Sequence, residues 1–523
     1  MKNKFILVAA LAIGFAGCEP EFENEVNAAY TSGQADFTRY VAVGNSLTAG
    51  YMDGTVCRVG QTYSYPNLLA QQFALVGGGA FTQPSFAEDV NNLGGILGVP
   101  GFNRRLVLDA TQVNPNGTVG AVEQITGVTT ITLTPQAKAY NNMGVPGAKS
   151  FHLLLPGYGA LNPYFARHAT SPTATVMADA MTKNPTFFTN WIGSNDVLAY
   201  ATAGGAQADG VTPAADHNTT GNVNPLTYGF NDITNSTYFN GVYTNIINTL
   251  TINGAKGVVC TIPSVTSIPY FTTVPVKALP AEATSGNATA IGLYQFLAAV
   301  SGGRISPLST AAGTKNPVLI RDESLTDIGP TIQAAAASTP FAPFAAALGA
   351  LYGKARHAKY NDNNPNDPSN DLIVLPASSI IGQPNPAGTA PFNVNGVTLP
   401  LANKWVLTAS EKARVAAATT AYNTSIIAIA NTKNLAVADM NAVMNKLVSG
   451  LKIETNSIYT ANYFSGSATE GQVLFSLDGV HPNARGYAVI ANELIKTINA
   501  KFKSNLPLHN PTYFPGISIL PTN

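Results

Sequence analysis

The chain has 523 residues, of which 45% are hydrophobic and only 11% are charged, so it can build a large core but presents few charges to solvent. Lysine plus arginine equals aspartate plus glutamate at 28 each, and the sequence contains no run of basic residues. This balance argues against a nucleic-acid partner, because phosphate backbones are bound by clustered positive charge.

The N-terminus has the pattern of a bacterial export signal. Lys2 and Lys4 precede an apolar run at 5–16 that is too short to span a bilayer, and the run is followed by Gly17 and Cys18. Small residues before a cysteine resemble a lipobox. The resemblance implies that residues 1–17 are a lipoprotein signal peptide and that Cys18 carries the lipid. An ordinary signal peptide with an incidental cysteine is the alternative.

Residues 18–36 are predicted to be an acidic, polar tether that begins with EPEFENE after Cys18. An acidic stretch at this place resembles the surface-export signal of some Gram-negative lipoproteins, and a plain solvated tether fits equally well. We expect an exported lipoprotein anchored in the outer membrane by its lipid. The sequence leaves its periplasmic or surface orientation open.

Strand and helix patterns then alternate along the chain. Strands are predicted at 38–44, 137–144, 185–193, 255–263 and 435–441, and helices at 64–75, 238–254, 410–434 and 483–502. Such alternation predicts an α/β domain with a parallel sheet that has helices on both sides. We place this domain at 37–505, with long insertions at about 77–135 and 272–405, and a tail at 506–523. The insertions are expected to project over the strand ends and to shape the acyl site.

Polar clusters follow the first three predicted strands at 44–46, 144–147 and 193–196, and a fourth at 478–481 precedes the last helix. Open α/β sheets carry their sites at the carboxyl ends of the strands. The clusters are therefore expected to converge at one edge of the sheet, and Ser46 stands where a nucleophile would be placed.

The residue types in these clusters suit acyl transfer. A serine hydroxyl is a weak nucleophile until a base takes its proton, and His481 is the natural base for Ser46. Asp478 lies three residues before His481, so its carboxylate can reach the imidazole Nδ1. The backbone N–H groups of Ser46 and Gly147 and the side-chain amide of Asn195 are candidate donors to an oxyanion.

Other chemistries find little support in the sequence. Neither a Cys-x-x-Cys nor a His-Glu-x-x-His motif is present, so we expect no zinc ribbon, no thioredoxin-like site and no zinc site of the His-Glu-x-x-His type. The remaining histidines have no metal-like spacing and are expected in the core or on the surface: His152, His168, His217, His357 and His509. For Cys57 and Cys260 we favour buried thiols, because Cys260 lies in a predicted buried strand, and a disulfide stays open. Trp191 is expected in the core, and packing is favoured over pocket lining for Tyr51 and Tyr63.

The segments GNSLTAGY, NMGVPGAKS, WIGSNDVL and DGVHPNARGY resemble, in this order, the conserved blocks of the SGNH (GDSL-type) hydrolases. The resemblance spans 39–498 without the two insertions, and SYPNLLAQQF resembles the first helix of the family. It implies a flavodoxin-like three-layer α/β/α fold and ester hydrolysis without metal or cofactor. Asn45 departs from the family, which has aspartate before the serine.

Matched block by block, the resemblance assigns the nucleophile to Ser46, the oxyanion donors to Gly147 and Asn195, and the catalytic pair to Asp478 and His481. We therefore expect a lipid-anchored serine esterase or lipase that acts on an acyl lipid or an acetylated glycan. The alternative is a surface lipoprotein of the same fold that binds glycan or lipid without turnover. The sequence does not decide the acyl group, the alcohol or the oligomeric state.

Overall fold

The computed structural model describes residues 29–84, 88–113, 119–282, 288–463 and 472–520. Its centre is a parallel sheet of five strands: β1 (Tyr40–Gly44), β6 (Asn142–Gly144), β7 (Phe187–Trp191), β8 (Lys256–Cys260) and β15 (Ala436–Ala438). The strands lie in the order β15-β8-β7-β1-β6. Numbered along the chain from the β6 edge, this order is 2-1-3-4-5, so the direction of winding reverses between β1 and β7.

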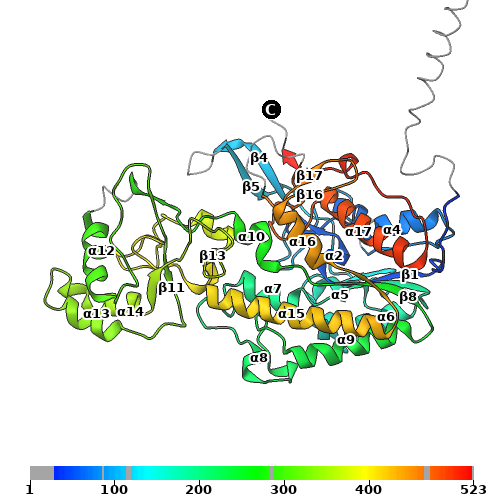
Figure 1. The fold of residues 1–523 in the computed structure, drawn as a ribbon, viewed down its shortest axis with the longest axis horizontal. Helices are drawn as coiled ribbons and strands as arrows, with labels where there is room; N and C mark the ends of the chain where they lie inside the picture. Colours follow the sequence, from blue (N-terminus) through cyan, green and yellow to red (C-terminus); the bar gives the residue numbers. More distant parts are fainter. Residues whose placement is uncertain (1–28, 85–87, 114–118, 283–287, 464–471, 521–523) are drawn as a thin grey trace, which may run out of the picture.

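Helices cover both faces of this sheet (Figure 1). One face packs against α4 (Tyr65–Ala74) and α17 (Ala484–Phe502), and the other against α6 (Val176–Met181), α9 (Ser236–Thr251) and α15 (Ala409–Thr432). Neighbouring strand residues point to opposite faces. Phe187 accordingly belongs to the core with α4 and α17, and Phe188 to the core with α9 and α15. The predicted α/β architecture with a helix-flanked parallel sheet is confirmed.

The first predicted insertion carries a hairpin of β4 (Leu106–Val113) and β5 (Val119–Gln124). The predicted tail does not hang free, because β18 (Ile519–Leu520) pairs in parallel with β4. Leu108 of this hairpin packs with Leu477 and Ile517 in a small apolar cluster. The hairpin and the tail together therefore reach the segment that precedes Asp478.

The second predicted insertion forms a lobe beside the sheet, at the left of Figure 1. Its helices are α12 (Ala288–Val300), α13 (Gly329–Ala336) and α14 (Ala345–Tyr352), and they share a hydrophobic cluster of their own. Its strands form short antiparallel pairs: β9 (Leu279–Pro280) with β10 (Lys315–Asn316), β11 (Leu319–Arg321) with β12 (Ala355–His357), and β13 (Leu372–Ile373) with β14 (Val406–Leu407).

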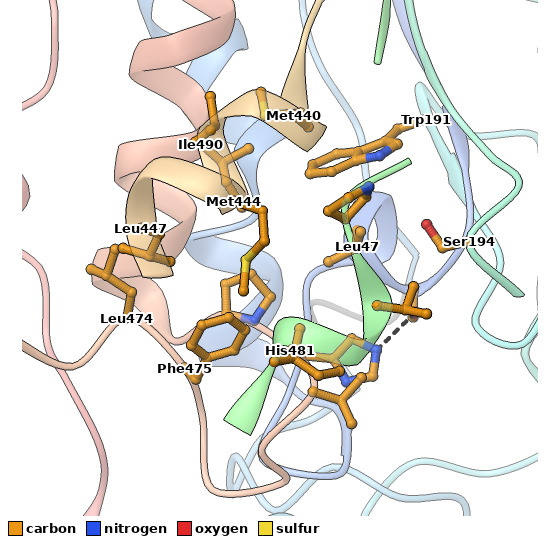
Figure 2. Close-up of a pocket in the computed structure, with 18 of the residues that line it drawn as sticks. Leu47, Trp191, Ser194, Met440, Met444, Leu447, Leu474, Phe475, His481 and Ile490 are labelled. Carbon is orange, nitrogen blue, oxygen red and sulfur yellow. Dashed lines mark hydrogen bonds between the residues drawn. The ribbon is translucent and has the colours of Figure 1, made fainter. Parts of the chain in front are cut away.

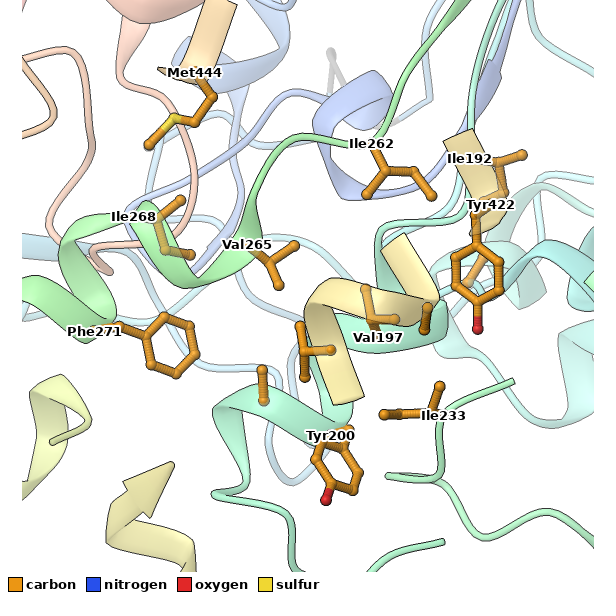
Figure 3. Close-up of a cluster of buried hydrophobic side chains, with 14 of the residues drawn as sticks. Ile192, Val197, Tyr200, Ile233, Ile262, Val265, Ile268, Phe271, Tyr422 and Met444 are labelled. Carbon is orange, nitrogen blue, oxygen red and sulfur yellow. The ribbon is translucent and has the colours of Figure 1, made fainter. Parts of the chain in front are cut away.

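Short elements fill the connections near the carboxyl edge of the sheet. They are α2 (Ser46–Ala49), β2 (Tyr51–Met52), β3 (Thr55–Val56), α3 (Arg58–Thr62), α5 (Pro163–His168), α7 (Asn195–Thr202), α8 (His217–Thr220), α10 (Pro269–Thr272), α16 (Met440–Ser449), β16 (Leu451–Lys452) and β17 (Ile458–Tyr459). Figure 3 shows the hydrophobic contacts of two of these connections: Val197 of α7 and Val265 lie in one cluster with Tyr422 of α15. This core fixes the segments that follow β7 and β8.

Cys57 and Cys260 are both buried and free, as expected for buried thiols. None of the described helices combines the length and the hydropathy that crossing a membrane requires. Cys18, the signal segment 1–17 and residues 18–28 of the predicted tether lie outside the described residues.

Candidate active site

The turn at Ser46 is shaped by Gly44 and Asn45. A β-carbon on Gly44 would lie 2.5 Å from the Trp191 carbonyl oxygen, so the end of β1 has room only for glycine. Asn45 is the N-cap of α2, because its side-chain oxygen accepts a hydrogen bond from the Leu47 N–H at 3.1 Å. Helix α2 therefore starts directly at the strand end and holds Ser46 as its first residue. Ser46 is 6% exposed.

Ser46, His481 and Asp478 form one continuous line of hydrogen bonds. The Ser46 Oγ lies 2.8 Å from the His481 Nε2, and the His481 Nδ1 lies 2.9 Å from the Asp478 Oδ2. With the proton on Nδ1, the imidazole donates to the carboxylate and its Nε2 accepts from the serine hydroxyl. This arrangement lets His481 remove the proton of Ser46. The predicted triad residues are thus brought together.

The Asp478 carboxylate is surrounded by donors. Its Oδ1 accepts from the backbone N–H groups of His481 and Val480, both at 2.8 Å, and from the Ser476 Oγ at 3.1 Å. Its Oδ2 accepts from the Gly54 N–H at 3.1 Å and from the His481 ring. Burial opposes ionisation, but the His481 ring and these backbone hydrogen bonds hold the pKa of Asp478 below its ordinary value. The carboxylate therefore stays charged and fixes the orientation of the imidazole.

Asp53 is a second buried carboxyl beside the triad, and the sequence patterns gave no role to it. Its backbone N–H donates to the Ser476 Oγ at 3.0 Å, and its Oδ1 accepts from the Leu477 N–H at 3.0 Å. It is 2% exposed and has a left-handed φ of 54°. These bonds tie the turn after β2 to the segment that carries Asp478. Asp53 is therefore a positioning residue for the triad.

The candidate oxyanion donors Gly147 and Asn195 lie on neighbouring loops. Ala148 N–H donates to the Val145 carbonyl at 3.1 Å, which closes a turn with Pro146 and a left-handed Gly147 (φ 78°) at its centre. The Asn195 Nδ2 donates to the Ala148 carbonyl at 2.9 Å and keeps a second hydrogen for a ligand. No acceptor for the backbone N–H of Ser46 or Gly147 is found among the described residues. All three predicted donors are therefore available.

Asp196 locks these two loops together. Its carboxylate accepts from the Ser150 N–H and from the Ser150 Oγ, both at 2.8 Å, and the residue is fully buried. Burial raises the pKa of Asp196 in spite of nearby Lys149 and these hydrogen bonds. The bond pair sets the distance between the Gly147 turn and Asn195, the first residue of α7.

A narrow apolar cavity of about 110 Å³ opens beside Ser46 and His481. Four side chains at helical spacing on α16 line one wall, namely Met440, Val443, Met444 and Leu447, and Val489 and Ile490 of α17 continue it. Figure 2 shows Met440 and Met444 on the side opposite Leu47 and Trp191, with His481 at one end. Trp191 is 2% exposed, so it is a core residue as expected and lines the cavity as well.

A wider cleft of about 580 Å³ lies on the other side of the same catalytic residues. It is lined by Ser46, Gly147, Asn195 and His481, and by aromatic side chains that include Tyr51, Tyr158, Tyr164 and Phe230. Tyr51 lines this cleft, so the preference for packing over pocket lining is wrong for this residue, and its ring also lies against His481 with the centroids 4.5 Å apart. Tyr63 instead packs against Phe514 and lines neither space, as far as the described residues go.

Of the two insertions that were expected to shape the acyl site, only the first lines a space beside Ser46 within the described residues. The first insertion supplies Gly101 and Phe102 to the wide cleft. Among the described residues of 272–405, none lines the cavity or the cleft. The second insertion contacts the segment that carries Asp478 and His481, where Leu375 packs closely against Gly479. The cavity takes much of its lining instead from α16 and from the first turns of α17.

Comparison of the chain with models of known protein families, with curated proteins and with solved structures finds no match. Within the described residues, no group of three or more histidine, cysteine, aspartate or glutamate side chains is arranged to hold a metal ion. The interpretation of the site therefore rests on the geometry of its own residues.

The buried carboxyl of Asp53 predicts that the free energy of unfolding depends on pH. Burial raises the pKa of its carboxyl to about 7. The hydrogen bond from the Leu477 N–H lowers this pKa, and the negative charge of Asp478 raises it. Between about pH 4 and 7 the folded chain then binds a proton that the unfolded chain has lost, so the free energy of unfolding falls as the pH rises. The slope for one such group is about 1.4 kcal/mol per pH unit.

Asp53→Asn keeps the shape and the acceptor for Leu477 but does not titrate. The quantity to compare is the free energy of unfolding of the variant minus that of wild type. We expect this difference to be roughly 3 kcal/mol larger at pH 8 than at pH 4. Burial also raises the pKa of Glu411 to about 7. Its effect on stability is present in both proteins and cancels in the difference. Urea unfolding at the two pH values measures this difference. An equal difference between variant and wild type at both pH values would contradict the prediction.

Proposed function

We propose that this chain is a serine esterase of the SGNH (GDSL) type that hydrolyses carboxylic esters. The observation that carries the proposal is the line of hydrogen bonds from Ser46 through His481 to Asp478, 2.8 Å and 2.9 Å long, at the carboxyl edge of a parallel sheet. The strand order 2-1-3-4-5, which is that of flavodoxin-like folds, supports the assignment. So does the position of Ser46 after β1, where the direction of winding reverses.

In the first half of the reaction, the Ser46 Oγ bonds to the ester carbonyl carbon while its proton passes to the His481 Nε2. The carbonyl oxygen becomes an oxyanion that accepts hydrogen bonds from the Ser46 and Gly147 N–H groups and the Asn195 amide. The bond from carbon to the alcohol oxygen then breaks. His481 gives the proton to the departing alcohol, and the acyl group stays on Ser46.

In the second half, water gives a proton to His481 while its oxygen bonds to the acyl carbon. The bond to Ser46 Oγ breaks, the serine regains its proton from His481, and the carboxylic acid leaves. Asp478 holds the imidazolium in place during both halves. Over both halves, one ester and one water give one alcohol and one carboxylic acid.

A fluorophosphonate probe tests the proposal, because it reacts with an activated serine. Wild-type protein should be labelled, Ser46→Ala should not, and hydrolysis of a panel of p-nitrophenyl esters should disappear with the label. A folded wild-type protein that takes no label and hydrolyses neither these esters nor acetylated glycans would favour the non-catalytic binding protein instead.

We further propose that the enzyme is held at a membrane by a lipid on Cys18. The support is the sequence pattern before Cys18, which lies outside the described residues. Expression with radioactive palmitate tests the proposal: wild-type chain should be labelled, and a Cys18→Ser chain that is still labelled would refute it.

A further inference from the structure

The cavity and the cleft divide the site into two unequal halves. The cavity beside Ser46 is narrow, about 110 Å³, whereas the cleft on the other side of His481 is about 580 Å³. An ester also has two halves, which lie on either side of the carbonyl carbon that Ser46 attacks. Each half of the substrate must therefore occupy one of these spaces.

The walls of the cavity suit a flexible hydrocarbon chain. Its lining on α16 and α17 is aliphatic or thioether, and Met440 and Met444 adapt their shape to a bound group because methionine is unbranched and polarizable. A glycan would have to leave its hydroxyl groups without partners along these walls, which is unfavourable. The wider cleft, which is lined by aromatic rings, has the room for a bulkier alcohol.

We infer that the cavity is the acyl pocket and that the substrates are esters of medium-length aliphatic acids, with the alcohol in the aromatic cleft. The inference rests on the proposed esterase function and chooses acyl esters over acetylated glycans. An acetyl group would leave the walls formed by Met444 and Leu447 uncovered. A longer chain buries methylene groups there, and each buried methylene strengthens binding by about fourfold.

The first test is the chain-length profile of the wild type on p-nitrophenyl acetate, butyrate, octanoate and palmitate. We expect kcat/KM for octanoate to exceed that for acetate by about fiftyfold, which corresponds to about three buried methylenes. The inference would be overturned if acetate were turned over as well as octanoate, or if an acetylated glycan were preferred to both. Either outcome would leave the esterase function intact.

The second test narrows the pocket with a matched control. Val443 on α16 lines the cavity, whereas Val448 on the same helix is 46% exposed and lies outside it. Val443→Phe should lower kcat/KM for octanoate at least tenfold more than it lowers kcat/KM for acetate. Val448→Phe should alter neither. Equal losses on both esters in Val443→Phe would show that the cavity does not hold the acyl chain.

The third test needs no turnover. The chain has two tryptophans, and of these Trp191 lines the cavity whereas Trp405 does not. The ligand is the free octanoate ion. Adding it to a Ser46→Ala, Trp405→Phe protein should change the Trp191 fluorescence in a saturable way, and a further Val443→Phe change should weaken this binding. An unchanged fluorescence refutes the acyl pocket. The fluorophosphonate label on wild-type Ser46 reports separately on the esterase function.

Discussion

Replacement of Ser46 or of His481 by alanine is expected to lower kcat by about 10⁶-fold, and the double replacement is expected to lower it hardly further. In the proposed mechanism the two residues act as one unit, because His481 removes the proton of Ser46 along the 2.8 Å hydrogen bond between Nε2 and Oγ. Single-turnover hydrolysis of an activated ester measures the loss. Additive losses in the double variant would mean that the two side chains act independently and that the triad assignment is wrong.

Asp478→Asn is the matched change for the third member of the triad. Every hydrogen-bond partner of the Asp478 carboxylate is a donor: the His481 ring, Ser476 Oγ and the N–H groups of Gly54, Val480 and His481. Whichever way an asparagine amide turns, its NH₂ group faces at least one of these donors. We expect kcat to fall by about 10⁴-fold, less than for Ser46→Ala. Activity close to wild type would exclude Asp478 from the triad.

Asn195→Ala is expected to lower kcat by about 10²- to 10³-fold with little change in KM, because a hydrogen bond to the oxyanion is formed only as the carbonyl oxygen gains charge. Asn195→Asp is the matched control for shape. It removes the same donor and adds a negative charge near the oxyanion, so its kcat should be lower than that of the alanine variant.

Steady-state kinetics on one ester separates the two possible roles of Asn195. A raised KM with an unchanged kcat would show that Asn195 binds the ground state of the substrate. Thermal melts control for folding, because the Asn195 amide also holds the Gly147 turn through the Ala148 carbonyl at 2.9 Å. A variant that melts like wild type and still loses kcat supports the oxyanion role.

The sheet and the candidate catalytic residues were accessible from sequence because their signals are local. β1 reads as an apolar run that ends in Gly44, Asn45 and Ser46, and Asp478 lies three positions before His481. A strand buried on both faces and a one-turn carboxylate–imidazole pair need no distant information. The same holds for α17, whose apolar side chains recur along one face of the helix.

Helix α16 was missed because its start resembles the end of a strand. The apolar residues of 435–441 predict one strand, but β15 stops at Ala438 and Asp439 caps the new helix by accepting from the Ala442 N–H at 3.1 Å. For α15 the sequence suggested a start at Ser410. The actual cap is Thr408, in a capping box with Glu411. Apolar residues at helical spacing also do not reveal whether they face a core or a cavity.

Asp53 could not be found from sequence for a different reason. Within YMDGTV it reads as an ordinary Asp-Gly turn, and its partner Leu477 is 424 positions away. Its role follows only from a tertiary contact, since neither end of the contact carries a recognisable pattern. The same limit applies to the second insertion, where entry at the carboxyl edge of the sheet suggested a substrate loop, but the chain folds into a lobe with its own core.

The two ends of the hydrogen bond between Ser46 and His481 are separated by 435 positions of the chain. A growing polypeptide therefore carries Ser46 long before His481 and Asp478 can reach it. In such a chain the Ser46 hydroxyl has no base beside it and keeps the reactivity of an ordinary serine. Under the proposed function, hydrolysis requires the fold to bring the 478–481 segment to α2, so an incompletely folded chain cannot cleave esters.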